Sequence, residues 1–212
     1  VAHVPLRVGT ARDEQKLYVA PARPERDDAT LEAPIRQSVP PGAAGRVTEV
    51  IEVYRASRQA RGLGATNNDV ADAVATASRF RMPALRLAEA QAAHQPRTYL
   101  YQFDWESPAR RGTLGACHGL EIPFVFGSIG RTGDDRMSGT GPEADHLSGQ
   151  MMDAWIAFAR HGDPAHEGIG AWPGYDRDER QTMVFGRTTG VQPAPFEEER
   201  SLWESMLGSR TV

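Results

Sequence analysis

Short runs of apolar, β-branched and aromatic residues predict three strands along the chain. They occupy residues 4–9, 98–104 and 182–185. Long stretches of helical pattern separate these runs, and this alternation favours an α/β fold with a largely parallel sheet. Three strands are few for a sheet that helices cover on both faces. We therefore expect a further stretch of polypeptide, outside these residues, to supply part of the sheet.

Apolar residues spaced three and four positions apart predict the helices. The clearest helix spans residues 145–160, where the apolar positions from Leu147 to Phe158 share one face, and Gly162 and Pro164 would end it. The other segments with this spacing, or with a strongly helix-favouring composition, are residues 29–39, 43–60, 67–77, 84–94 and 196–207.

The composition of the chain argues against several classes of function. The 212 residues carry 24 Lys and Arg against 28 Asp and Glu, with a formal charge of −4 and no basic block, so we expect no nucleic-acid or membrane partner. The apolar runs are far shorter than the roughly 18 residues that a spanning helix needs. The N-terminal residues show no signal-peptide pattern, and a cytoplasmic location is the expectation.

Metal chemistry is disfavoured as well. Cys117 is the only cysteine, which excludes an internal disulfide and a cysteine-based zinc site. His161 and His166 flank Asp163, but they stand five residues apart in a turn rich in Gly and Pro. That arrangement is more typical of a helix terminus than of a metal site.

The stretch that carries candidate chemistry surrounds His118. Small residues flank this histidine, and the segment follows the predicted strand 98–104, so the imidazole could stand at the mouth of a cleft and shuttle a proton. On chemistry alone, a buried or surface histidine without catalytic work is the commoner outcome. The acidic pair Asp13 and Glu14 has an equally ordinary interpretation, as a solvated pair that caps the next helix.

The residues around His118 resemble a known family. Residues 115–127 read GACHGLEIPFVFG and are similar to the histidine segment of the type B carboxylesterases, which include bacterial para-nitrobenzyl esterases and cholinesterases. Further segments resemble the same family in the same order. They are VPLRVGTARDE at 4–14, TYLYQFDW at 98–105, MMDAWIAFARHGDP at 151–164, WPGYD at 172–176 and TMVFG at 182–186.

The resemblance implies roles for individual residues. His118 matches the catalytic histidine of the family, and Glu14 matches the triad acid that orients it, so the fold must bring together side chains 104 positions apart. Asp13 is then a local capping or structural carboxylate, and Glu121 is a neighbour of the site without a chemical step. The family often has Gly after the acid, whereas this chain has Gln15.

The nucleophile of that family is missing from the chain. No serine stands in the G-x-S-x-G pattern of the nucleophile elbow, and Ser128 fails because Phe126 precedes it by two positions. The resemblance therefore implies an α/β fold that is the C-terminal part of an α/β-hydrolase fold. Residues 1–212 would form the C-terminal portion of one catalytic domain, with residues 39–97 as a helical region near the substrate entrance.

The implied activity is hydrolysis of a small-molecule carboxylic ester by a Ser-His-Glu triad. The N-terminal portion of the same esterase would be the partner that carries the serine and the oxyanion hole, and no cofactor is implied. The alternative is a cholinesterase-like binding or adhesion module that has lost catalysis. A G-x-S-x-G in the upstream sequence would favour the enzyme, and its replacement would favour the binding module.

Overall fold

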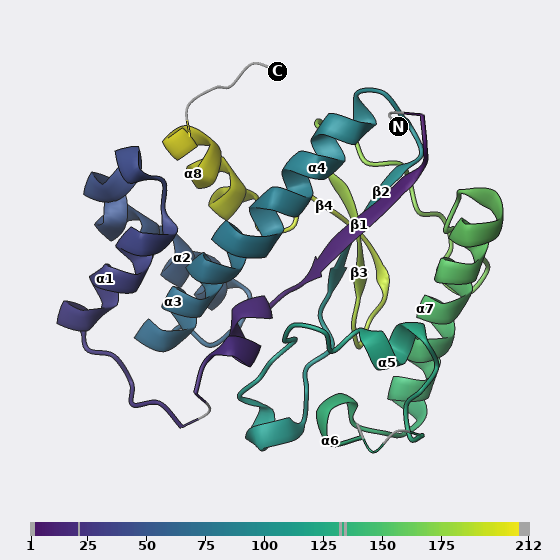
Figure 1. Cartoon of the computed structure of the whole chain (residues 1–212), viewed down its shortest axis with the longest axis horizontal. Coiled ribbons are helices and arrows are strands. Elements are labelled where there is room, and N and C mark those ends of the chain that lie inside the picture. The colour runs from purple at the N-terminus through teal and green to yellow at the C-terminus, as the bar shows by residue number, and fades with distance from the viewer. Residues whose placement is uncertain (1–2, 21, 132, 134, 208–212) are drawn as a thin grey trace. The chain divides into compact units, whose positions relative to one another are not determined.

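Four strands form one mixed sheet in the computed structural model, which describes residues 3–20, 22–131, 133 and 135–207 (Figure 1). Strand β1 (Leu6–Ala11) is parallel to β2 (Thr98–Phe103), which is parallel to β3 (Gln181–Phe185). Strand β4 (Gly190–Pro193) is antiparallel to β3 and completes the order β1-β2-β3-β4. The three strands predicted from sequence are thus present.

The structure corrects two details of the predicted strands. Strand β1 begins two residues later than predicted and includes Thr10 and Ala11, which the sequence left outside the strand. Strand β4 was missed altogether. Its four residues include a glycine and a proline and no buried position, so its hydrogen bonds with β3, and not an apolar pattern, make it a strand.

Helices cover both faces of the sheet, as β2 shows. Successive side chains of this strand point to opposite faces. Tyr99 and Phe103 belong to the large core cluster with α5 (Ile122–Val125) and α7 (Pro142–His161). Leu100 points to the other face and packs with Ala88 of α4 (Met82–Ala92). Both faces of the strand are therefore buried, as in the α/β fold that the sequence predicted.

The limits of α7 follow from its terminal residues. Pro142 stands at the first turn, where a missing N–H does no harm, and Gly162 takes a left-handed conformation with φ +69° that ends the helix. Gly162 ends the helix as predicted, although the helix extends one residue further, to His161, and its start lies three residues earlier than predicted. No helix among the described residues is long and apolar enough to cross a membrane.

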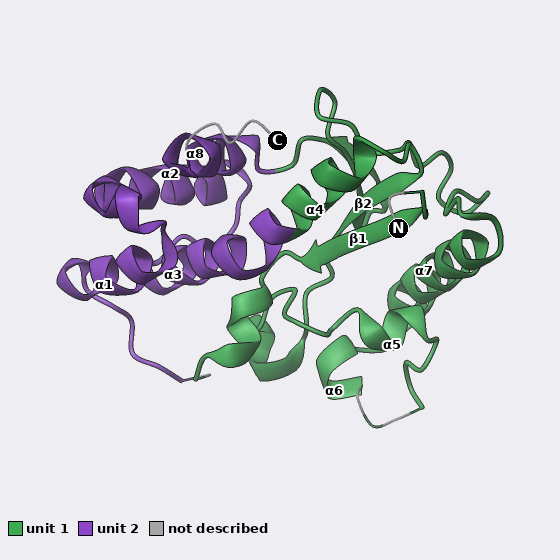
Figure 2. Cartoon of the chain, turned by 45° about the horizontal axis from the view of Figure 1, so that its top comes forward, with its two compact units in different colours: residues 1–21, 84–195 green, residues 22–83, 196–212 purple. Residues whose placement is uncertain are grey.

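The chain divides into two compact units, which Figure 2 shows in green and purple. Unit 1 comprises residues 1–21 and 84–195 and contains the sheet. Unit 2 comprises residues 22–83 and 196–212.

Unit 2 is helical. Its main helices are α1 (Asp28–Ser38), α2 (Val47–Ala60), α3 (Asn67–Thr76) and α8 (Glu197–Leu207). Tyr54 is fully buried among them, and its hydroxyl accepts a hydrogen bond of 2.6 Å from the indole N–H of Trp203. The predicted helix over residues 43–60 is wrong at its start, because Pro41–Arg46 form a 3₁₀ turn (η2) and the α-helix begins at Val47.

The remaining elements are short. A π-helical turn, η3 (Ala77–Arg81), joins α3 to α4. Unit 1 also contains the 3₁₀ turns η1 (Glu14–Tyr18) and η4 (Ala109–Gly112) and the one-turn helix α6 (Asp135–Ser138). Of these, η1 directly follows β1 and carries one of the predicted site residues.

Candidate active site

The candidate site lies beyond the carboxyl ends of β1 and β2. Glu14 is the first residue of η1, three positions after the end of β1, and His118 lies in the segment that follows β2. Because β1 and β2 are parallel neighbours, both chain segments leave the sheet at the same edge. Residues 104 positions apart in sequence can meet there.

The two side chains are in direct contact. Glu14 Oε2 lies 2.5 Å from His118 Nδ1. The other carboxylate oxygen, Oε1, accepts a hydrogen bond of 2.8 Å from the backbone N–H of Ala11 at the end of β1. The strand therefore fixes one oxygen of Glu14, and the second oxygen holds the imidazole with its Nδ1 toward the acid.

Exposure distinguishes the two partners. The Glu14 side chain is 7% exposed, whereas the His118 side chain is 43% exposed. The acid thus lies inside the protein and the imidazole lies at its surface. The ring of Tyr18, at the end of η1, packs against the imidazole with the ring centroids 5.3 Å apart. This contact was not anticipated from the sequence, which offers no signal for it.

A second carboxylate, that of Glu121, lies within electrostatic reach of this pair. Glu121 Oε2 is buried and has no hydrogen-bond partner within the described ranges. Burial raises the pKa of Glu121, the negative charge of Glu14 raises it further, and His118 opposes the rise. Glu121 is therefore a neighbour of the pair in electrostatic terms, which agrees with its predicted place near the site.

Asp13 has a different role from helix capping. It precedes η1 at the N-cap position, but its side chain makes no capping hydrogen bond there. The carboxylate instead accepts a hydrogen bond of 3.1 Å from the backbone N–H of Ala116, two residues before His118. Of the two interpretations that the sequence left open for Asp13, the structural carboxylate is the one observed.

Cys117 lies next to His118 but points into the core of unit 1, where it is fully buried. Burial raises the pKa of its thiol to about 11. We expect iodoacetamide at pH 8 to modify Cys117 in the folded protein at least about 100-fold more slowly than a free cysteine, because little thiolate forms. Mass spectrometry of the alkylated protein measures this rate, and a sample in urea is the control. Rapid modification of the folded protein would contradict the prediction.

The described residues contain no group of three or more His, Cys, Asp or Glu side chains that could hold a metal ion. His166 was one of the two histidines weighed from the sequence as a metal ligand. Its Nε2 lies 3.0 Å from the carbonyl oxygen of Gln150, and its Nδ1 lies 3.1 Å from the backbone nitrogen of Gly168. These contacts give His166 a structural role in the turn after α7.

The fold and this pair together define a class. A mostly parallel sheet, covered by helices, with a carboxylate and an imidazole in contact beyond adjacent strand ends, is typical of part of an α/β hydrolase. The chain belongs to the carboxylesterase family, whose sequence profile matches residues 3–203.

Individual relatives agree with this assignment. The para-nitrobenzyl esterase of Bacillus subtilis (strain 168) is 30% identical over 199 residues, which cover 93% of this chain and 37% of that enzyme. The phenmedipham hydrolase of Pseudarthrobacter oxydans is 37% identical over 109 residues, covering 50% of this chain and 22% of that protein. A solved carboxylesterase of Geobacillus stearothermophilus superposes with a TM-score of 0.74 at 29% identity, covering 96% of this chain and 39% of that one.

The chain therefore spans a little over a third of the length of the relatives that it matches over most of its own length. It corresponds to part of an α/β-hydrolase fold, as the sequence predicted.

Proposed function

We propose that this chain is the portion of a serine carboxylesterase that supplies the acid and the histidine of a Ser-His-Glu triad. The contact of 2.5 Å between Glu14 Oε2 and His118 Nδ1 is the observation that carries the proposal. Burial of the acid and exposure of the imidazole support it, since a triad histidine must reach substrate on one side and its acid on the other.

In the proposed mechanism, His118 moves a single proton back and forth through Nε2, the ring nitrogen that does not face Glu14. It takes the proton from the hydroxyl of a serine on the N-terminal portion as that oxygen attacks the ester carbonyl carbon. It then gives the proton to the alcohol oxygen as the ester C–O bond breaks. A water molecule repeats the sequence on the acyl-enzyme and releases the acid.

Glu14 has an electrostatic part in this scheme. When His118 holds the extra proton, the imidazolium carries a positive charge against the buried carboxylate. The carboxylate stabilises that charge and keeps Nδ1 protonated, so that Nε2 is the basic nitrogen in the resting state. All of these steps use protein side chains, and the proposal needs no cofactor.

The proposed partner is the N-terminal portion of the same esterase. Among the described strands, β1 pairs with β2 alone, so its outer edge is available for pairing with a further strand. Large apolar side chains in the two segments that carry the pair are also exposed, with Phe126 at 75%, Ile122 at 55% and Tyr18 at 54%. A covering segment or an ester substrate would bury such residues.

The proposed substrates are small-molecule carboxylic esters. This class follows from the reaction that the pair supports and from the family, several members of which are named as esterases or carboxylesterases. The contacts of Glu14 and His118 define the proton transfers and not the shape of the acyl or alcohol group.

Reconstitution tests the proposal. Residues 1–212 are produced alone and together with the remaining portion of the esterase, and hydrolysis of para-nitrophenyl acetate is followed by absorbance. We expect no hydrolysis above buffer from residues 1–212 alone and turnover from the combined protein, with a phosphonate ester labelling a serine outside residues 1–212. A folded combined protein without turnover would favour a binding or adhesion module, and turnover by residues 1–212 alone would contradict the proposed division of the triad.

A further inference from the structure

Asp13 connects two chain segments at two points. Its backbone N–H donates a hydrogen bond of 2.9 Å to the carbonyl oxygen of Ala116, and its carboxylate accepts one of 3.1 Å from the N–H of the same residue. Asp13 directly precedes Glu14, and Ala116 is two residues before His118. The pair of contacts at Asp13 therefore joins the turn that carries the acid to the loop that carries the histidine.

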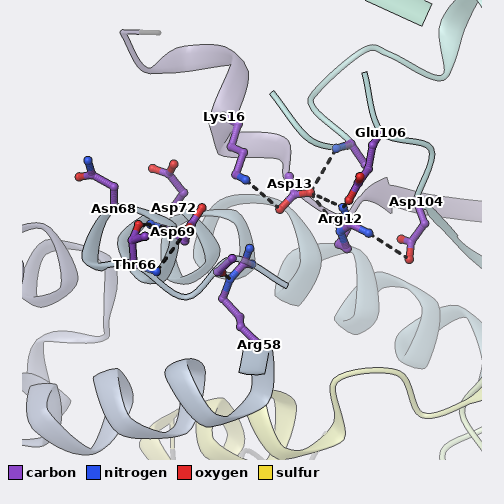
Figure 3. A network of polar contacts seen from close by, with 12 residues as sticks. Arg12, Asp13, Lys16, Arg58, Thr66, Asn68, Asp69, Asp72, Asp104 and Glu106 are labelled. Atoms are coloured by element: carbon purple, nitrogen blue, oxygen red, sulfur yellow. Dashed lines mark hydrogen bonds and ion pairs between the residues drawn. The ribbon is translucent and has the colours of Figure 1, made fainter. Parts of the chain in front are cut away.

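The Asp13 carboxylate is buried, at 3% exposure, and cations compensate its charge. Arg12 donates to it from Nε at 3.0 Å, and Lys16 Nζ lies 3.9 Å away (Figure 3). Arg12 also pairs with Glu106 at 2.5 Å and with Asp104 at 3.8 Å. Burial alone would lower the pKa of Arg12, but these three carboxylates together raise it, so the guanidinium stays charged.

Gly115 makes the approach of Asp13 possible. A Cβ atom at position 115 would lie 2.5 Å from Asp13 Oδ2, which is closer than such atoms come in real structures. The backbone of Gly115 also has φ +54°, a left-handed conformation that favours glycine. Glycine at position 115 is thus the residue type that leaves room for the Asp13 carboxylate to reach the N–H of Ala116.

We propose that Asp13 is a positioning residue, which sets the alignment of His118 with Glu14 by holding the two segments together. The inference rests on the proposed function, since it assigns a role within the same triad. Ala116 is too near His118 for the loop to shift without moving the imidazole. A displacement of about 1 Å in a catalytic group can lower the rate about 100-fold.

The test uses the protein that contains this chain together with the rest of the esterase. We expect Asp13→Ala to lower kcat for para-nitrophenyl acetate about 100-fold with little change in KM. Asp13→Asn should recover much of kcat, since its amide oxygen can still accept from Ala116.

Asp176→Ala is the matched control. Asp176 lies in an exposed turn, where its carboxylate accepts hydrogen bonds from the N–H groups of Asp178 and Glu179. It therefore loses contacts of the same kind away from the pair, and we expect kcat and KM to stay unchanged. If Asp13→Ala fails to fold, Gly115→Ala displaces the same carboxylate, and it should lower kcat with little change in KM.

The outcomes separate this inference from the proposed function. Normal kcat in a folded Asp13→Ala protein, or in Gly115→Ala where that variant replaces it, would overturn the positioning role, provided that His118→Ala is inactive. Turnover that survives in His118→Ala would instead overturn the triad itself, whatever Asp13 does. A fall in kcat without recovery in Asp13→Asn would show a structural role only, and would also overturn the inference.

Discussion

Replacing His118 with alanine is expected to lower kcat for a para-nitrophenyl ester by about 10⁶-fold in the protein that contains this chain and the remaining esterase. Without the imidazole no group accepts the proton of the attacking serine, and none returns it to the leaving alcohol. The loss should fall on kcat, because His118 contributes to proton transfer and not to the binding of the ester. Initial rates over a range of ester concentrations measure both constants.

His146→Ala is the control for this experiment. His146 is an exposed histidine on α7, so its removal deletes an imidazole without touching the Glu14–His118 pair. We expect its kcat to equal that of the unmodified protein. Near-normal turnover after the loss of His118 would remove that residue from its proposed role and would leave the contact with Glu14 as a structural ion pair.

The sequence predicted those elements in which buried positions recur at a regular spacing along the chain. Strands β2 and β3 are buried on both faces, and α7 has one apolar stripe, so their patterns stand out from the surrounding sequence. Strand β4 has no such pattern because none of its residues is buried. Its existence depends on the hydrogen bonds of β3, which is a tertiary effect that local composition does not record.

The candidate site, too, could be predicted from the sequence only in part. Glu14 and His118 could be chosen from sequence because their segments resemble those of a family, and the structure brings the two side chains together. The resemblance left two interpretations of Asp13 open, a capping and a structural carboxylate. An aspartate before a helical turn is ordinarily a cap, and only the fold shows that Ala116, 103 positions away, is its partner.

Glu121 illustrates a third kind of limit. Its position three residues after His118 indicated proximity, but not that its Oε2 would be buried or that burial would raise its pKa. Part of that outcome depends on the charge of Glu14, which belongs to a distant part of the chain. Sequence spacing predicts which residues are neighbours, whereas the electrostatic state of a residue depends on everything packed around it.

Glu14→Gln is expected to lower kcat by about 10⁴-fold, which is less than the loss in His118→Ala. The reason lies in the two contacts of the carboxylate, since Ala11 N–H donates to Oε1 and His118 Nδ1 faces Oε2. A glutamine has one oxygen and one NH₂ group for these two positions. If its oxygen accepts from Ala11, the NH₂ group faces Nδ1 and favours the tautomer with the proton on Nε2.

That tautomer cannot accept the proton of the serine, so the imidazole is present but holds its proton on the wrong nitrogen. The opposite orientation of the amide would set its NH₂ group against the Ala11 N–H, which costs stability instead. Glu143→Gln is the control, because Glu143 is an exposed carboxylate on α7 that pairs with Arg187. Steady-state kinetics and thermal unfolding of both variants separate the two orientations. Full activity in a stable Glu14→Gln protein would show that the carboxylate does not determine the tautomer of His118.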